Sequence, residues 1–378
     1  MNRTQLLAML SLACACAHQV AMAEQQRYEY QDLGGAADAY AVNDAGLVVG
    51  VRYNAQNRLQ AVVWDKQGVP AFLTDLAGGP SFATAINQQG QIAGQSWNLG
   101  TTPKAVAWSD GAITTLATKA DQPYGQAVGI NAGGLIAGNT SATFGGASTA
   151  VVWQGLGVKP LGHAGGTSSV ATGLNDAGLV TGYVEGIGGT FGPQAVVWQG
   201  GVATLLPNLV SSYAYSKAYA VNQDGAVVGA ANTGTSGYIR AVIWRNGEVS
   251  ALTAIGDADQ AQGINDSGVV VGTKDFSGGS HRAALWDTTT GLSGDLNVLV
   301  GSGTLPFNIT LIEAHAINNL GDIVGTSYNK TTGNFGAFAL RAVPEPSTWL
   351  MFAMGMAGLA RAARHRSAQR RLQGMPAH

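Results

Sequence analysis

The chain alternates short apolar runs with turn residues, and this pattern extends from about residue 28 to residue 342. Ala-Val-Val-Trp at 61–64 and Ala-Val-Ile-Trp at 241–244 are apolar at every position, as expected for strands that are covered on both faces. Turn-forming residues follow each run, as in Asp-Lys-Gln-Gly at 65–68. The pattern therefore predicts many short β-strands joined by tight turns.

A longer pattern repeats around these runs. The sequence Ala-x-(Ala/Gly)-(Val/Ile/Leu)-Asn-x-x-Gly-x-(Val/Ile)-x-Gly occurs seven times, with spacings of 44, 44, 44, 47, 43 and 53 residues between successive asparagines. The seven asparagines are Asn43, Asn87, Asn131, Asn175, Asn222, Asn265 and Asn318. An Ala-x-x-Trp run follows six of them and ends at Trp64, Trp108, Trp153, Trp198, Trp244 and Trp286, whereas the seventh run ends at Leu340.

Each repeat has room for four short strands. Asn at the first position of Asn-x-x-Gly can bond its own backbone, and Gly at the fourth can take a positive φ, so strands flank this turn as a hairpin. Repeats of about 40–50 residues with four strands each are typical of β-propellers. Residues 24–342 divided among seven repeats give about 46 residues each. The sequence therefore predicts an all-β, seven-bladed β-propeller over 24–342.

Closure of the ring can also be predicted. The chain begins with a strand at 28–33 that resembles the last strand of a repeat and finishes its repeats with a Trp-type strand at 337–340. If the two pair, the first strand completes the last blade and removes the free sheet edges. A linear β-solenoid is the alternative, but it would need polar caps at both ends.

The first 23 residues have the pattern of a secretory signal peptide. Arg3 gives a positive start, 6–17 is apolar, and Ala21, Met22 and Ala23 form a small-x-small site before Glu24. An uncleaved anchor and a lipoprotein site at Cys14 are the alternatives. Both cysteines, Cys14 and Cys16, lie in this segment, so the mature chain is expected to have no disulfide and no thiolate metal site.

The last 36 residues have three parts: a short proline motif, an apolar segment at 347–360 and a basic tail at 361–371. The motif is Val343, Pro344, Glu345 and Pro346, and the tail begins with Arg361, Arg364 and Arg366. This arrangement resembles the PEP-CTERM sorting signal of Gram-negative bacteria. The resemblance implies an exosortase as processing partner, transient anchoring in the inner membrane, and delivery to the cell surface or the medium. An ordinary C-terminal membrane anchor is the alternative.

The repeats resemble the HAF-type extracellular repeats of secreted bacterial proteins over residues 33–342. Asp-Leu-Asn-Val-Leu at 295–299 matches an insertion that this family carries in its last repeat, and it accounts for the 53-residue spacing. The missing seventh Trp departs from the pattern and leaves the packing of the closing blade open. The family implies no activity for particular residues.

Composition narrows the function classes. Hydrophobic residues make up 46% of the chain, which allows a packed core and argues against disorder. Charged residues make up only 11%, and the net charge of −2 provides no basic surface for nucleic acid. The predicted mature span has 14 Lys and Arg against 21 Asp and Glu, or about −7, which favours solubility.

Candidate chemistry is sparse. We interpret the repeated Trp as packing between blades and the repeated Asn as a turn former. The position after the Asn carries Asp44, Gln88, Ala132, Asp176, Gln223, Asp266 and Asn319, which we interpret as solvated turn positions. The three mature histidines, His163, His281 and His315, lack metal-ligand spacing and are expected in solvated or capped loops. No nucleophile elbow, zinc motif or phosphate loop occurs, so we expect no catalytic residue, metal or cofactor.

One set of loops, between the final Gly of the repeat motif and the Ala-x-x-Trp run, carries an aromatic in nearly every copy. These aromatics are Tyr53, Trp97, Phe144, Tyr183, Phe191, Tyr238 and Phe335. If the loops share one rim, they form a candidate binding face; ordinary aromatics folded over blade edges are the alternative. The long segment at 287–311 is a second variable region.

These observations favour a secreted or surface-displayed, non-enzymatic binding or matrix protein. The PEP-CTERM resemblance implies a bacterium that makes exopolysaccharide and biofilm, so exopolysaccharide or another surface protein is the expected partner. An extracellular polysaccharide lyase or hydrolase is one alternative, but it would need asymmetric acid, base or metal groups. A self-assembling structural component of the cell surface is the other.

Overall fold

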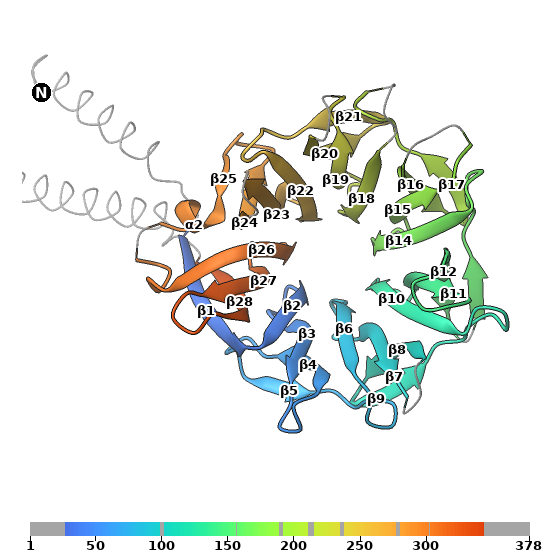
Figure 1. The fold of residues 1–378 in the computed structure, drawn as a ribbon, viewed down its shortest axis with the longest axis horizontal. Helices are drawn as coiled ribbons and strands as arrows, with labels where there is room; N and C mark the ends of the chain where they lie inside the picture. Colours follow the sequence, from blue (N-terminus) through green and yellow to red (C-terminus); the bar gives the residue numbers. More distant parts are fainter. Residues whose placement is uncertain are drawn as a thin grey trace, which may run out of the picture. The chain divides into compact units, whose positions relative to one another are not determined.

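The computed structural model describes residues 27–98, 102–155, 157–188, 192–210, 215–234, 238–276, 280–301 and 303–343. Residues 28–342 form one compact unit of seven four-stranded sheets arranged in a ring around a central axis (Figure 1). The predicted seven-bladed β-propeller is confirmed. The predicted signal peptide, most of the sorting motif, the apolar segment and the basic tail lie outside the described residues.

In six of the sheets the strands follow the chain from the central axis outward, and in the seventh the first strand of the chain, β1, takes the outermost place. The inner strands are β2 (Ala37–Val42), β6 (Ser81–Ile86), β10 (Tyr124–Ile130), β14 (Ser168–Leu174), β18 (Ser216–Val221), β22 (Ala258–Ile264) and β26 (Ile309–Ile317). The second strands are β3 (Val48–Tyr53), β7 (Ile92–Trp97), β11 (Ile136–Ser141), β15 (Val180–Glu185), β19 (Val227–Asn232), β23 (Val269–Phe276) and β27 (Ile323–Asn329). We number the blades 1 to 7 in the order of these strands.

The outer half of each blade carries the Trp-type strand and a short edge strand. The third strands are β4 (Leu59–Trp64), β8 (Pro103–Ser109), β12 (Ser148–Gln154), β16 (Gln194–Gln199), β20 (Ile239–Arg245), β24 (Ser280–Asp287) and β28 (Asn334–Val343). The outermost strands are β5 (Pro70–Phe72), β9 (Ala112–Thr115), β13 (Gly157–Pro160), β17 (Val202–Leu205), β21 (Glu248–Ala251), β25 (Ser293–Asp295) and, in blade 7, β1 (Arg27–Gly35).

The first strand of the chain closes the ring. Strand β1 pairs with β28, so the last blade combines both ends of the repeat region (Figure 1). This is the predicted pairing of the segments at 28–33 and 337–340. Because each blade then has a neighbour on both sides, closure leaves no blade at the end of an open array.

The Asn-x-x-Gly turn joins the inner strand to the second strand, and we call the face that carries these turns the turn face. Gly46, the fourth residue of the first turn, has a φ of +80°, and the equivalent glycines have φ between +75° and +91°. The last glycine of the motif is required for a different reason. A Cβ on Gly50 would overlap the carbonyl oxygen of Asp38, because the two strands approach closely at a bulge between Ala39 and Ala41.

The repeated asparagines also join the blades to one another. Each Asn Nδ2 donates a hydrogen bond to the backbone carbonyl of the equivalent Asn in the next blade, at distances of 2.9 to 3.4 Å. The bond from Asn318 to Asn43 completes a closed ring of seven. Their Oδ1 atoms accept backbone N–H groups within their own turns. The asparagines are 2 to 6% exposed. In each blade, one buried side chain therefore stabilises its own turn through Oδ1 and joins the next blade through Nδ2.

A second, outer set of bonds follows the residue after each Asn. Its backbone N–H donates to the side chain of the equivalent residue in the next blade in six of seven cases, at 2.7 to 3.0 Å. The exception is the N–H of Gln88, because the next residue in this set is Ala132. These positions are exposed or half-buried, as expected for turns, but their acceptor side chains also connect neighbouring blades.

The six repeated tryptophans lie between blades. All are 0 to 2% exposed, and each indole Nε1 donates to a backbone carbonyl next to the outermost strand of the preceding blade, at 2.6 to 2.9 Å. In the first blade, for example, Trp64 bonds Leu33 O of β1. The indole ring is therefore buried and its N–H is hydrogen-bonded at the same interface between blades.

The seventh blade replaces this contact. Leu340 packs in one buried cluster with Leu296 and Val300, which belong to or follow the short helix α2 (Leu296–Leu299) in the 287–311 insertion. Asn297 holds the insertion against β26 through paired bonds of 2.7 and 2.9 Å with the backbone of Leu311. The insertion thus contributes apolar side chains to the core that Leu340 occupies in place of a Trp.

We expect Asn175→Ala to destabilise the propeller by about 2 kcal/mol, because it leaves the Leu179 N–H without its acceptor and removes the bond to the Asn222 carbonyl, which keeps only the Gly225 N–H. Urea unfolding of the purified protein measures this. Gln89→Ala, at an exposed turn position, is the control and should change stability by less than about 0.5 kcal/mol. Equal effects of the two substitutions would contradict a structural role for the asparagine ring.

Ala132→Asn should have the opposite effect. It supplies the missing side-chain acceptor for the N–H of Gln88, and a new hydrogen bond of this kind contributes about 1 kcal/mol. Ala45→Asn, at an exposed position of the first turn, adds the same side chain without that partner. A melting temperature that rises for Ala132→Asn but not for Ala45→Asn is the expected result, and a fall for both would refute it.

Candidate functional site

The central channel is lined by a position of the repeat that the sequence motif leaves unspecified and that varies in chemistry. Three residues before each Asn, between two positions that are always small, the side chain is half-buried on the inner strand. These seven residues are Tyr40, Thr84, Val128, Thr172, Tyr219, Gln262 and His315. All seven contribute to one cavity of about 280 Å³ on the axis, bounded by all seven inner strands. The flanking positions are therefore small in every blade, whereas the seven side chains that line the cavity differ in chemistry from blade to blade.

His315, on β26, is the most heavily bonded member of this ring. Its Nδ1 lies 2.9 Å from Gln262 Oε1, and Gln262 Nε2 donates to Thr273, which fixes the amide with its oxygen toward the imidazole. Nε2 lies 3.2 Å from the hydroxyl of Thr326 and 3.4 and 3.5 Å from the carboxylates of Asp38 and Glu313.

Both ring nitrogens of His315 therefore face oxygen atoms, which suits the doubly protonated imidazolium. Burial alone would lower the pKa of His315, but the hydrogen bond and charge of Asp38 and the charge of Glu313 outweigh it and raise the pKa above its usual value. Tyr40 lies beside it, with ring centroids 5.8 Å apart. Burial and the charge of Asp38 raise the pKa of Tyr40, so it remains a neutral phenol.

This cluster joins the first blade to the last. Thr326 donates a hydrogen bond to Asp38, so β27 in blade 7 contacts β2 in blade 1 as well. Gln262 adds a link to β22 in blade 6. Three blades contribute to one polar group, and residues 38 and 315 are brought together only by ring closure.

A second charged group lies on the other side of the channel, in blades 4 and 5. The ammonium of Lys217, on β18, lies 4.4 Å from the ring centre of Tyr183 and 6.0 Å from that of Tyr215. In the same register, five residues before the Asn, blades 2 and 4 carry the apolar Phe82 and Val170. This register therefore carries carboxylates at the junction of blades 7 and 1, an ammonium in blade 5 and apolar side chains in blades 2 and 4.

The predicted binding aromatics do not form one cluster. Tyr53, Trp97 and Tyr183 are strand residues of β3, β7 and β15, because the second strands extend further than the repeat pattern indicated. The antiparallel order places the connections between second and third strands on the face opposite the Asn turns, which we call the loop face. Phe191 lies outside the described residues.

Their described contacts are local. Trp97 packs against Phe82 with ring centroids 5.6 Å apart, and Phe335 packs against Tyr328 at 5.4 Å. Phe144, Phe335, Tyr53 and Tyr238 are 44 to 72% exposed. Only Tyr183 contacts a charged side chain of the inner ring directly, through Lys217.

Sequence reasoning missed the channel residues, and it placed two of the three histidines wrongly, whereas His163 lies in a loop as expected. His315 lies on the innermost strand and not in a loop, and His281 lies on β24, where its Nδ1 is 2.6 Å from Asp275. The available signal was the repeat alignment itself. The position three residues before each Asn is the unspecified x of Ala-x-(Ala/Gly), so its variation within a fixed frame marks it as free for function.

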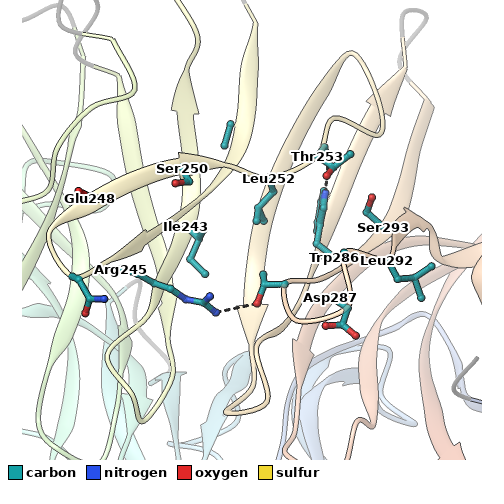
Figure 2. A pocket seen from close by; sticks show the side chains of 14 residues that line it. Ile243, Arg245, Glu248, Ser250, Leu252, Thr253, Trp286, Asp287, Leu292 and Ser293 are labelled. Atoms are coloured by element: carbon teal, nitrogen blue, oxygen red, sulfur yellow. Dashed lines mark hydrogen bonds between the residues drawn. The ribbon is translucent and has the colours of Figure 1, made fainter. Parts of the chain in front are cut away.

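A larger hollow, of about 440 Å³, lies between blades 5 and 6 (Figure 2). It is crossed by the 3.0 Å bond from Arg245 to Thr288 and bordered by Trp286, whose indole donates to Thr253 (Figure 2). These contacts hold neighbouring blades together in the same way as at the other interfaces. We therefore take the central cavity, with its convergent polar groups, as the candidate site.

The arrangement can donate and accept hydrogen bonds and hold protons on Tyr40 and His315. Among the described residues, no group of three or more His, Cys, Asp or Glu side chains has the arrangement of a metal site. The described part of the chain also contains no helix long and apolar enough to cross a membrane.

Two solved structures are similar to the propeller. The β-propeller domain of the Trilobed protease from Pyrococcus furiosus has 14% sequence identity and a TM-score of 0.54, and the match covers 82% of this chain and 99% of that domain. That domain has an open velcro topology, whereas β1 pairs with β28 here. Puromycin hydrolase has 11% identity and a TM-score of 0.52, over 85% of this chain and 57% of the hydrolase. At these identities the likeness shows the fold alone.

No curated protein matches the chain in sequence. The model of the PEP-CTERM protein-sorting motif matches residues 342–366, which confirms the resemblance that the proline motif, apolar segment and basic tail indicated. This motif marks proteins for export and for processing by an exosortase. The chain is thus a seven-bladed β-propeller protein that carries a PEP-CTERM protein-sorting motif, which implies export and processing by an exosortase.

Proposed function

We propose that the exported propeller is a non-enzymatic binding protein of the extracellular matrix and that its ligand is exopolysaccharide. The observation that carries this proposal is the uneven ring of channel side chains on an otherwise invariant frame. A purely structural ring has no need for Tyr, Thr, Val, Gln and His at equivalent positions, whereas a binding site needs different groups at different points of its ligand.

The chemistry of the channel mouth suits a carbohydrate. Sugar rings present apolar faces that stack on aromatic side chains and hydroxyl groups that exchange hydrogen bonds. Tyr40, Tyr219 and Gln262 provide hydroxyl and amide groups in the cavity, and Tyr183 and Tyr215 lie around Lys217. Sorting to the cell exterior supports the same proposal, since an exported protein meets the exopolysaccharide there.

An extracellular enzyme is the second candidate. The polar sector supplies the asymmetric acid and base groups whose absence from the repeat pattern had argued against catalysis: Tyr40 and His315 hold protons, and Glu313 lies 3.5 Å from the imidazole. A lyase or hydrolase acting on polysaccharide would use such groups. Binding remains the leading proposal, because the two nitrogens of His315 are already engaged with side chains of the protein.

We expect the purified protein to bind exopolysaccharide from its own bacterium saturably in calorimetry, with and without calcium. Val128→Trp places an indole into the central cavity and should weaken binding at least about tenfold, because it occupies the space that the ligand needs. Leu320→Trp, at a 60% exposed turn position, is the matched control and should bind as the unmodified protein does.

The same mixtures should be assayed for new reducing ends and for unsaturated sugar ends. Saturable binding without either product is the expected result. Product formation that is lost in Val128→Trp would replace the proposal with the enzyme. Absence of both binding and product would refute a polysaccharide ligand, and concentration-dependent assembly in sedimentation experiments would then favour the structural surface component.

A further inference from the structure

The polar sector of the channel carries more negative than positive charge. The carboxylates of Asp38 and Glu313 both approach the imidazolium of His315, at 3.4 and 3.5 Å from Nε2. Within the described residues, neither carboxylate forms an ion pair with a lysine or arginine. One imidazole carries at most one positive charge and cannot neutralise two carboxylates, so the cluster has a surplus of negative charge.

Both carboxylates are partly exposed and lie beside the central cavity: they approach His315, which lines it, but do not line it themselves. The side chains of Asp38 and Glu313 are 29% and 38% exposed, against 18% for His315. Asp38 is engaged by the hydroxyls of Thr326 and Tyr40. Glu313 has only its ion pair with His315 among the described side chains. The cluster can therefore accept further hydrogen bonds from a ligand, and an ionised donor would also satisfy its charge.

Tyr40 and the size of the cavity restrict the class of ligand further. The ring of Tyr40, next to His315, offers a π face that attracts cations. The cavity of about 280 Å³ is about the size of one sugar unit and is small for the small-molecule pockets of proteins. The ligand group that fits best is compact, cationic and rich in hydrogen-bond donors.

We infer that the central cavity and the carboxylates beside it bind a sugar unit that carries a free ammonium group, with the ammonium at Asp38 and Glu313 and the ring in the cavity beside Tyr40. The inference rests on the proposed function and specifies its ligand class: an exopolysaccharide with partly deacetylated amino sugars. Because all seven inner strands surround the cavity, the unit enters as a chain end or a side branch. Uronate sugars are disfavoured at this sector by repulsion between like charges.

The test compares three trisaccharides by calorimetry near pH 6, where the sugar amine is protonated: a glucosamine trisaccharide, its fully N-acetylated counterpart and a uronate trisaccharide. We expect the glucosamine trisaccharide to bind the purified full-length protein most tightly, with an affinity that falls as salt is added. Equal binding of the glucosamine and N-acetylated trisaccharides would overturn the inference, because they differ in the ammonium group.

Two substitutions that change the charge in opposite directions locate the site. Glu313→Gln removes the surplus negative charge and should weaken glucosamine binding about tenfold, as expected for the loss of one charge-assisted interaction. His315→Gln removes the positive charge, makes the cluster more negative and should strengthen the same binding several-fold. General damage to the fold would weaken binding in both variants, so opposite signs separate charge recognition from a structural effect.

Glu185→Gln is the matched control, since Glu185 is an exposed carboxylate at the end of β15 in blade 4. It should leave glucosamine binding unchanged, and an effect equal to that of Glu313→Gln would overturn the assignment.

The proposed function and the proposed ligand class can fail separately. Exopolysaccharide binding without any glucosamine preference refutes only the ligand class, whereas glucosamine binding without exopolysaccharide binding refutes the matrix function and leaves the site in place.

Discussion

One hydrogen bond per blade, from an Asn side chain to the backbone of the next Asn, constrains the whole molecule. The bond is buried and directional, so it fixes how each inner strand sits against its neighbour, and seven equal steps return to the start at Asn318 and Asn43. A buried amide that lost its partner would cost more than the bond contributes. The closed ring therefore specifies the number of blades as well as joining them.

This constraint leaves little freedom in the repeat except at one place. The small residues on either side of position 315 and its equivalents leave room for the bulge of the inner strand. The glycines of the motif allow the turn and the close approach of the second strand. The Trp fills the interface between neighbouring blades. Only the side chain that points into the channel is free of these packing demands. The side chains that differ between blades therefore lie around the central axis, on strands that hold them in fixed positions.

The sequence allowed the fold to be predicted because its signals are local and repeated seven times. A turn that needs Asn and Gly, a run that ends in Trp, and a first strand that matches the last strand of a repeat together give the blades, their number and their closure. The bonds between blades could not be predicted in this way. The acceptor of Asn43 Nδ2 lies 44 residues away, and nothing in one repeat indicates that its side chain bonds the next. The positions of the loop aromatics were also only partly predictable, since several of them lie on the ends of strands that extend further than the repeat pattern indicated.

The candidate site depends on closure in a way that no single repeat shows. Asp38 and Tyr40 belong to the first blade and Glu313 and His315 to the last, so the negatively charged sector exists only when β1 has paired with β28 and the two blades have met. The imidazolium offsets part of the repulsion between two carboxylates that closure brings together, and it leaves negative charge for a ligand. A bound cation would then stabilise the seam between the first and last blades, because it binds the closed ring and not the open one. Binding at the axis and integrity of the ring are in this way two effects of the same contacts.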